Sequence, residues 1–273
     1  MLRILLVCLG FGMVCPGNWL SAEEPAPTPV VEVRELFNGH DLTNWYTFIK
    51  DRGRDVDPQK VFTVRNGMIH ISGEELGCIT TEEAFENYRL QIEYRWTGQT
   101  FPPRIDKARD CGVLIHSVGK DGGWHKTWMF SIECNIIEGG TGDFIVVGDG
   151  SDRYSITVSC LPEKQKNCGV FDPTEKGEPI TIHGGRVNWF QRDPNWKDQV
   201  DFRGANDLEK PVGEWNLLEV IADGDTITNI VNGKVTNIAR NVRPQCGKIQ
   251  IQSEFAGIEI RKITLLPLEP KKP

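Results

Sequence analysis

Two ionisable side chains stand in stretches of this sequence that otherwise read as buried β-strands. His116 follows an apolar run, and Glu133 alternates with apolar residues along the next predicted strand. Side chains of a strand alternate between its two faces, so Ser131, Glu133 and Asn135 are expected to share one face. An ionised carboxylate on such a strand costs free energy unless its face is wet, paired or functional. Chemistry is therefore expected at these residues, with His116 beside them.

The same residues could hold a metal ion. His116 and Glu133 are candidate ligands for a divalent cation, and His125 lies on the Gly/Trp-rich loop between the two strands. The spacing of these residues matches no standard metal motif, and a single buried histidine is more often a core residue. A divalent metal ion is the cofactor that the sequence suggests.

A second polar row occurs on a predicted strand near the end of the chain. Gln250, Gln252 and Glu254 alternate with apolar or small residues and should face one way. Placed beside Glu133 and Asn135, they would line a sheet face with amides and carboxylates. Such a face suits sugar hydroxyls, which need both donors and acceptors. The alternative is a solvated face of an antiparallel sheet, which is common.

Tryptophans in loop-like contexts are candidates for contact with a sugar ring. Exposed indoles stack on sugar faces, whereas buried indoles fill volume. Trp124 and Trp189 fall in stretches rich in Gly, Pro or charge, and His125 follows Trp124. These three residues are predicted to bind substrate, with simple packing as the alternative.

Several other chemistries are not supported. The sequence has no Gly-x-Ser-x-Gly elbow, no P-loop and no dinucleotide-binding glycine motif. It also lacks the Glu-x-Asp-x-x-Glu strand of retaining β-glucanases, so hydrolysis by two carboxylates on one strand is not supported. No Cys-x-x-Cys spacing occurs, although Cys160 and Cys168 flank a short excursion that a disulfide could close.

The elements that must position these residues are short strands. Residues 61–71 read as two alternating strands joined by the Asn66-Gly67 turn, and residues 88–96 alternate throughout. Helical signal is confined to one or two turns near residues 81–86. Many short strands with Gly and Asn turns indicate an all-β antiparallel β-sandwich. Residues 160–212 read as long loops over one side, where function is often found.

The ends of the chain suggest export. Residues 1–22 read as a secretory signal, because one early Arg precedes an apolar run too short to span a bilayer. Residues 23–32 read as a disordered linker, 33–268 as a single domain and 269–273 as a tail. The mature protein is thus expected to be periplasmic or secreted, without a membrane span. A formal charge of −7 without a basic run argues against nucleic acid or anionic membrane as partner.

Five longer motifs cover most of the predicted domain in order. They are ELFNGHDLTNW (35–45), CGVLIHSVGKDGGW (111–124), SIECNIIEGGTGDF (131–144), GEWNLLEVIADGDTITNIVNGK (213–234) and GKIQIQSEFAGIEIRKITLLPL (247–268). Together they resemble the 3-keto-disaccharide hydrolase family. The resemblance implies a concanavalin A-like jelly roll of the lectin and glucanase superfamily, with long loops on a concave side that binds carbohydrate.

The resemblance also implies an activity on glycosides already oxidised at C3. The C3 carbonyl acidifies the C2 hydrogen, so a general base can remove it while the aglycone leaves C1, and water can then add to the 2-hydroxy-glucal. Glu133 matches the acidic position of the family's Ser-Ile-Glu strand, His116 the His of its Gly-Val-Leu-x-His strand, and Glu254 the Glu of its Gln-Ser-Glu turn. These three are the implied catalytic residues. Asn135 stands where the family commonly has Gln.

Three functions stay open on the sequence. The leading hypothesis is an exported enzyme that cleaves 3-keto-glycosides or related oligosaccharides by elimination and hydration or by net hydrolysis. In it Glu133 is general base or metal ligand, His116 is electrophile or ligand, and Glu254, Asn135 and Gln252 orient hydroxyls. The second is a non-catalytic, lectin-like carbohydrate-binding module on the cell envelope. The third is a structural or adhesion domain whose polar face is merely hydrated.

Overall fold

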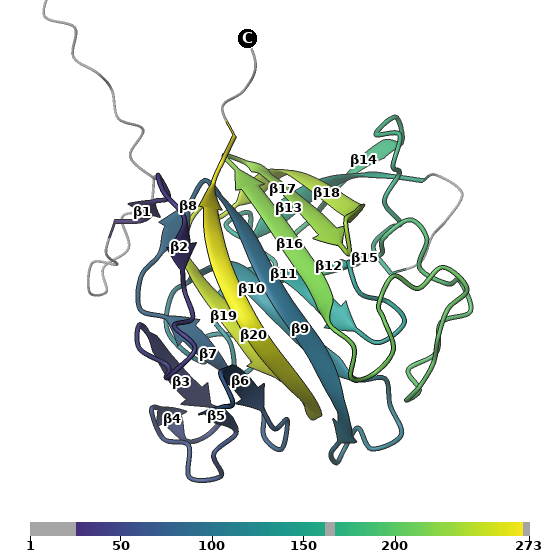
Figure 1. The fold of residues 1–273 in the computed structure, drawn as a ribbon. Helices are drawn as coiled ribbons and strands as arrows, with labels where there is room; N and C mark the ends of the chain where they lie inside the picture. The colour runs from purple at the N-terminus through teal and green to yellow at the C-terminus, as the bar shows by residue number, and fades with distance from the viewer. Residues whose placement is uncertain (1–25, 162–166, 270–273) are drawn as a thin grey trace, which may run out of the picture.

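The computed structural model describes residues 26–161 and 167–269, so the predicted signal segment lies outside the described residues. Within these ranges the chain forms strands and loops without a helix, and hence no helix that could cross a membrane. Two large sheets, antiparallel throughout, lie face to face (Figure 1). The predicted antiparallel β-sandwich is confirmed.

The smaller of these sheets has eight strands. In spatial order they are β15 (Gly185–Val187), β12 (Phe144–Val147), β11 (Phe130–Ile137), β10 (Asp110–Val118), β19 (Lys248–Ser253), β7 (Gly77–Thr81), β3 (Trp45–Ile49) and β4 (Gly53–Arg54). The strands that carry the two predicted polar rows, β11 and β19, therefore both neighbour β10.

The larger sheet lies in front in Figure 1. In spatial order it contains β14 (Glu178–Ile182), β13 (Ser155–Cys160), β18 (Lys234–Arg243), β17 (Thr226–Val231), β16 (Asn216–Asp223), β9 (Tyr88–Thr100), β20 (Ala256–Pro267), β6 (Met68–Ile71) and β5 (Phe62–Arg65), with β2 (Arg34–Glu35) paired to β20. A separate parallel pair joins β1 (Thr28–Pro29) to β8 (Phe85–Glu86).

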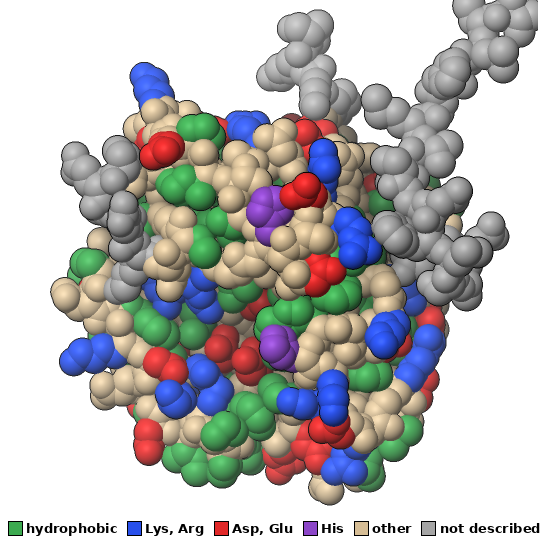
Figure 2. All heavy atoms as spheres, turned by 180° about the vertical axis from the view of Figure 1, so that it is seen from behind, with side chains coloured by type: hydrophobic (Ala, Val, Ile, Leu, Met, Phe, Trp, Pro, Cys, Tyr) green, Lys and Arg blue, Asp and Glu red, His purple; other side chains and the backbone are tan. Residues whose placement is uncertain are grey.

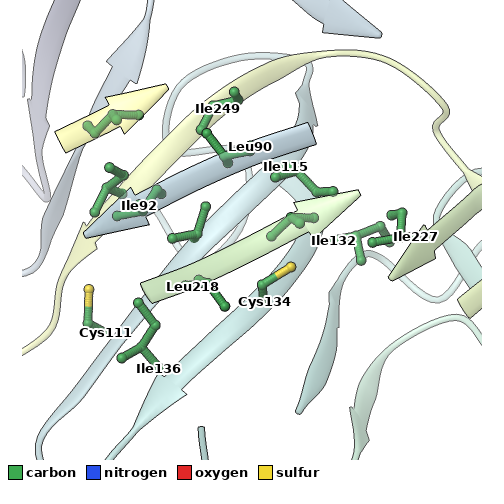
Figure 3. Packing of buried hydrophobic residues seen from close by; sticks show 14 of the residues in the cluster. Leu90, Ile92, Cys111, Ile115, Ile132, Cys134, Ile136, Leu218, Ile227 and Ile249 are labelled. Atoms are coloured by element: carbon green, nitrogen blue, oxygen red, sulfur yellow. The ribbon is translucent and has the colours of Figure 1, made fainter. Parts of the chain in front are cut away.

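Apolar side chains from both sheets fill the space between them (Figure 3). Leu90 and Leu218 come from the larger sheet, and Ile132 comes from β11 of the smaller one. Burying one such side chain stabilises the fold by about 1.5–3 kcal/mol. Because Ile132 points into this core, its neighbour Glu133 lies on the outer face of the smaller sheet.

A β-bulge interrupts β10 between Ile115 and Val118. His116 within it has a left-handed backbone with a φ of 52°. In a regular strand His116 would share the outer face with Leu114, but the extra residue of a bulge breaks this alternation. The ring of His116 instead packs edge-on against Tyr88 of the core, with 6.0 Å between ring centroids.

Several local expectations differ from the structure. Residues 81–86 form the end of β7, a bend and β8 rather than a helical turn. Thr28–Pro29 pairs with β8, so ordered structure begins inside the predicted linker of residues 23–32. Cys160 and Cys168 are free thiols, which leaves the excursion between them without a disulfide. The described residues of the region 160–212 are mostly in loops, but they also include β14 and β15.

Candidate active site

The predicted polar residues gather on the outer face of the smaller sheet, around β10. In the ladder between β10 and β11, Glu133 pairs with Leu114 and Asn135 pairs with Gly112. Gln252 approaches the same place from β19 on the other side of β10. Figure 2 shows this face, with acidic and basic side chains gathered around a hollow near its middle.

Asn135 is the centre of the hydrogen-bond network. Its Nδ2 donates to Glu133 Oε1 at 2.8 Å, to Asp110 Oδ1 at 3.2 Å and to the backbone oxygen of Cys111 at 3.2 Å. Its Oδ1 accepts from Arg186 Nη1 at 2.8 Å. Because a guanidinium only donates, Arg186 fixes which end of the amide faces the carboxylates. Asn135 thus presents N–H groups to two acidic side chains at once.

A buried ion-pair cluster holds Arg186. Asp143 Oδ2 accepts from Arg186 Nη1 at 2.8 Å and also pairs with Arg192. Asp143 Oδ1 accepts from the backbone N–H of Trp189 at 2.8 Å, and the Asp143 side chain is fully buried. Removing one partner of such a pair typically costs about 3–5 kcal/mol. The position of Arg186, and with it the orientation of Asn135, is therefore fixed by the fold.

Asp110 and Glu254 complete an acidic cluster with Glu133. Asp110 is buried, and its Oδ2 lies 3.3 Å from Arg104 Nη2. Arg104 also donates to Asp198 Oδ1 at 3.0 Å. Glu254 follows directly after β19 and is half-buried. The charges of Asp110 and Glu133 both act on Glu254, so the three carboxyl groups share one electrostatic environment.

Burial raises the pKa of all three carboxyl groups. Burial raises the pKa of Glu133 to about 8; the charge of Asp110 adds to this, whereas Asn135 and Arg186 oppose it. Burial and the charges of Asp110 and Glu133 raise the pKa of Glu254 well above its ordinary value. Burial likewise raises the pKa of Asp110, with Arg104 opposing. A carboxyl group such as that of Glu133, whose pKa lies near neutral pH, is suited to general acid–base catalysis.

Gln250 and Gln252 share the polar side of β19 but differ in their contacts. Gln250 Oε1 accepts from the backbone N–H of Met129 at 3.0 Å, and its Nε2 donates to Thr80 Oγ1 at 2.9 Å. Gln252 Oε1 is buried and has no partner within the described part of the chain. Of the two predicted sugar-binding amides, Gln250 is thus held in a structural role, and Gln252 keeps a free acceptor at the acidic cluster.

His116 does not join the cluster. Its Nδ1 lies 2.8 Å from the backbone oxygen of Pro244, and burial lowers the pKa of His116 to about 4. The ring is therefore neutral near pH 7 and faces the core. The sequence predicted that His116 and Glu133 would lie together, as a catalytic pair or as ligands of one metal ion. The structure does not bring them together, because the bulge in β10 turns the ring of His116 to the opposite face of the sheet.

The predicted aromatic contacts are spread over different places. Trp189 is buried and packs edge-on against Phe190, with 5.7 Å between ring centroids. Trp124 is half-buried, stacks on Trp128 at 5.6 Å and lies at 4.0 Å from the ring of His125, which is exposed. The structure therefore assigns packing to Trp189, and it leaves Trp124 and His125 on an accessible loop.

The described residues also bear on the metal prediction. Within 26–161 and 167–269, no group of three or more His, Cys, Asp or Glu side chains is arranged to hold a metal ion. His116 and Glu133, the two predicted ligands, lie on opposite faces of the smaller sheet.

Asp110, Arg104 and Arg186, which lie around Glu133 and Asn135, were not predicted as site residues from the sequence. Alternation could have found Asp110, since it lies two residues before Gly112 and the strand begins earlier than expected. Arg104 lies in a loop, and Arg186 lies on the short edge strand β15. Neither arginine has a local pattern that links it to β11, so only the tertiary fold reveals them.

The fold is that of a concanavalin A-like β-sandwich, and one of its two large sheets carries an acid–arginine cluster. Residues 32–266 match the family described as 3-keto-alpha-glucoside-1,2-lyase-like domain. The chain belongs to this family and is thus a carbohydrate-active protein, which confirms the resemblance seen in its motifs.

Several solved structures are similar to this chain. A protein of Parabacteroides distasonis ATCC 8503 that is assigned as a glycosyl hydrolase has a TM-score of 0.51 at 18% identity, over 87% of this chain and 94% of that chain. A second one from the same organism has a TM-score of 0.49 at 16% identity, over 87% and 100%. A β-glucanase of Bacillus licheniformis has a TM-score of 0.44 at 10% identity, over 87% and 99%. At 18% identity the likeness to the first of these structures concerns the fold alone. No curated protein matches this chain.

Proposed function

We propose that this protein cleaves 3-keto-glycosides by removing the C2 proton and expelling the group at C1, with Glu133 as the general base. The family to which the chain belongs supports this substrate class. The observation that carries the proposal is the buried Glu133 carboxyl group, whose pKa of about 8 lies near neutral pH. A base of this strength suits a C2 hydrogen that the adjacent C3 carbonyl has acidified.

Arg104 is the proposed stabiliser of the enolate. Negative charge develops on the C3 oxygen as the C2 proton leaves, and a guanidinium group can donate to it. Arg104 already contacts Asp110 in the cluster, and its Nε is buried without an acceptor in the described ranges. This donor takes the role that the sequence had suggested for His116.

Glu254 is the proposed general acid. Burial and the charges of Asp110 and Glu133 raise its pKa and so favour its protonated form, which can give a proton to the leaving oxygen as the C1–O bond breaks. In this step the C2 proton passes to Glu133, the C2–H electron pair forms the C1–C2 double bond, and the aglycone leaves as an alcohol. Water then adds across the double bond, and exchange with solvent restores both carboxyl groups.

The test is turnover of 3-keto-trehalose or a 3-keto-glucoside, followed by NMR. The wild type should release the aglycone, and Glu133→Gln should lower kcat by about 10²- to 10⁴-fold. Glu219→Gln is the matched control, because Glu219 is an equally buried glutamate on β16 of the other sheet, paired with Arg89. It should leave kcat unchanged.

Two results would reject the reaction. Unchanged substrate with the wild type, together with binding of unoxidised glycans, would favour the lectin-like alternative. Equal turnover by wild type and Glu133→Gln would remove Glu133 from the mechanism. We propose as well that the reaction takes place outside the cytoplasm, because residues 1–22 have the pattern of a secretory signal.

A further inference from the structure

A hollow lies on the outer face of the larger sheet, on the side of the sandwich away from the acidic cluster. Its volume is about 270 Å³, and it is lined by residues of β13, β14, β18 and the turn before β14. Ile156 and Val158 of β13 belong to the core, so Thr157 and Ser159, which alternate with them, face outwards and line the hollow. The hollow is therefore separate from the candidate active site.

A β-bulge shapes part of the wall of this hollow. The ladder between β13 and β18 shifts register between Ser155 and Thr157. Asn241 on β18, beside this shift, has a left-handed backbone with a φ of 50°. Bulges re-aim side chains and are frequent next to functional sites. Here the bulge brings Asn241 and its neighbour Arg240 to the hollow, and with them an amide and a guanidinium group.

The turn before β14 supplies a carboxylate to the same hollow. Asp172 Oδ1 accepts from the N–H of Thr174 at 2.9 Å, and the backbone oxygen of Asp172 accepts from the N–H of Glu175 at 2.9 Å. Glu175 Oε2 in turn accepts from Arg240 Nε at 3.1 Å. Among the described residues that line the hollow, Glu175 and Arg240 are the two that are ionisable, so the lining carries no net charge.

The lining combines donors, acceptors and apolar surface. Thr157, Ser159 and Asn241 supply hydroxyl and amide groups, whereas Pro179 and Ile238 supply apolar surface. Ser159 Oγ has no hydrogen-bond partner in the described part of the chain, so no internal hydrogen bond holds its rotamer and it can turn towards a ligand. A sugar ring matches this mixture, because its hydroxyls both donate and accept while its C–H faces are apolar.

We propose that this hollow is a second carbohydrate site, which binds one neutral pyranose residue of a glycan. The paired charges of Arg240 and Glu175 favour a neutral ligand over an anion or a metal ion. Pockets for drug-sized ligands occupy about 300–1,000 Å³, so a hollow of about 270 Å³ suits a single sugar ring. Because it lies away from the acidic cluster, this site can hold the protein on a glycan while the active site stays accessible. The inference does not depend on the proposed reaction.

NMR titration of the ¹⁵N-labelled protein tests the second site. Methyl α-glucoside, methyl β-glucoside, methyl α-mannoside and methyl β-galactoside are the probes, and at least one should shift the backbone amide signals of Thr157, Ser159 and Arg240 saturably. Arg240→Met should weaken this binding by about 10-fold or more, because it removes a charged donor. Ser159→Ala should weaken it without lowering Tm, since the hydroxyl has no partner among the described residues to lose. Thr63→Ala, on β5 at the far end of the same sheet, is the control and should change nothing.

Two comparisons separate this site from the reaction and from other ligands. The shifts should persist in Glu133→Gln, and saturable shifts without turnover of any 3-keto-glycoside would support the second site while rejecting the reaction. Turnover of a 3-keto-glucoside without saturable shifts on β13 and β18 by any of the four sugars would overturn the second site alone. Equal affinity of the wild type and Arg240→Met would also overturn it, as would shifts of these amides by sodium sulfate or calcium chloride at lower concentrations than by any sugar.

Discussion

Asn135 joins the half-buried Arg186 to two acidic side chains, so its amide can have one orientation only. Arg186 takes the Oδ1 end, and Glu133 and Asp110 receive the Nδ2 end. An N–H donated to a carboxylate stabilises its ionised form and lowers its pKa. Asn135 and Arg186 therefore keep the pKa of Glu133 lower than burial alone would make it.

Arg186→Met tests this positioning role. Loss of the guanidinium removes its favourable charge and frees Asn135 to rotate, so the pKa of Glu133 should rise further. The midpoint of the pH profile of kcat/KM, expected near pH 8 for the wild type with activity rising with pH, should move up by about one unit. Arg89→Met on the other sheet is the control. A midpoint that stays in place or moves to lower pH would contradict the role of Arg186.

Among individual residues, the sequence predicted the site residues that alternate along a strand. It did not predict the site residues that only tertiary contacts bring to the cluster. Glu133, Asn135 and Gln252 follow from the period of two. Arg104 and Arg186 come from a loop and an edge strand distant in sequence, and no local spacing relates them to β11.

The bulge in β10 decides which face His116 occupies. The ladder to β19 shifts register between Leu114 and Ser117, and the ladder to β11 shifts between Ile115 and Val118. The close approach of Gly247 to the His116 backbone belongs to the same feature. A left-handed conformation is costly for most residues, and bulges in which it occurs are held by the surrounding structure.

Substitutions at His116 should affect stability rather than chemistry. His116→Asn and His116→Val both lose the packing on Tyr88, but Asn tolerates a positive φ and Val does not. In urea unfolding, His116→Val should be about 1–3 kcal/mol less stable than His116→Asn. His116→Asn should keep the pH midpoint of kcat/KM. A shifted midpoint in this variant would return His116 to the active site.

The sequence predicted strands and hairpins correctly where the signal lies within a few neighbouring residues. The Asn66-Gly67 turn joins β5 and β6 as predicted, and the alternation at residues 88–96 matches the buried side of β9. The bulge had no such signal, since it depends on pairing with two neighbouring strands. The short helical turn expected near residues 81–86 gave way to pairing of β8 with β1 and with the backbone of Gly247.

The whole molecule buries several carboxyl groups, and their protonation links stability to pH. Burial, with help from Asp207, raises the pKa of Glu209 to about 7, although Tyr94 Oη and Trp96 Nε1 donate to it at 2.7 and 3.1 Å. The pKa of Glu133 is about 8. In the unfolded chain the pKa of both glutamates is about 4.3. Between these values the folded state binds protons that the unfolded state has released, so the free energy of unfolding falls as pH rises.

Thermal unfolding at several pH values should show this fall. Tm should decline from about pH 6.5 to pH 8, by about 2–4 °C for each kcal/mol, and level off above pH 8. Below about pH 6.5 the buried His116, with a pKa of about 4, opposes this fall, because its imidazole takes up a proton more readily in the unfolded chain. Glu209→Gln should make Tm less dependent on pH below about pH 7. Glu133→Gln should make Tm less dependent on pH up to about pH 8. A Tm that rises steadily from pH 5 to pH 8 would contradict the burial of neutral carboxyl groups.

The β-sandwich was predictable because the sequence patterns that indicate strands and turns are repeated along the chain. Alternation, Gly and Asn turns and the family motifs recur from the first strands to the last, so single local errors do not change the architecture. The acid–arginine cluster was only half predictable, because it forms where β10, β11, β15 and a loop converge.

The central claim is that Glu133 removes the C2 hydrogen of a 3-keto-glycoside. The most direct measurement is kcat/KM for a 3-keto-glucoside and its C2-deuterated form, at a pH above the Glu133 pKa of about 8. A primary isotope effect of about 3 or more is predicted if proton removal limits the rate, together with C2 deuterium loss that is abolished in Glu133→Gln. Aglycone release with the C2 deuterium fully retained in the sugar product would contradict the account.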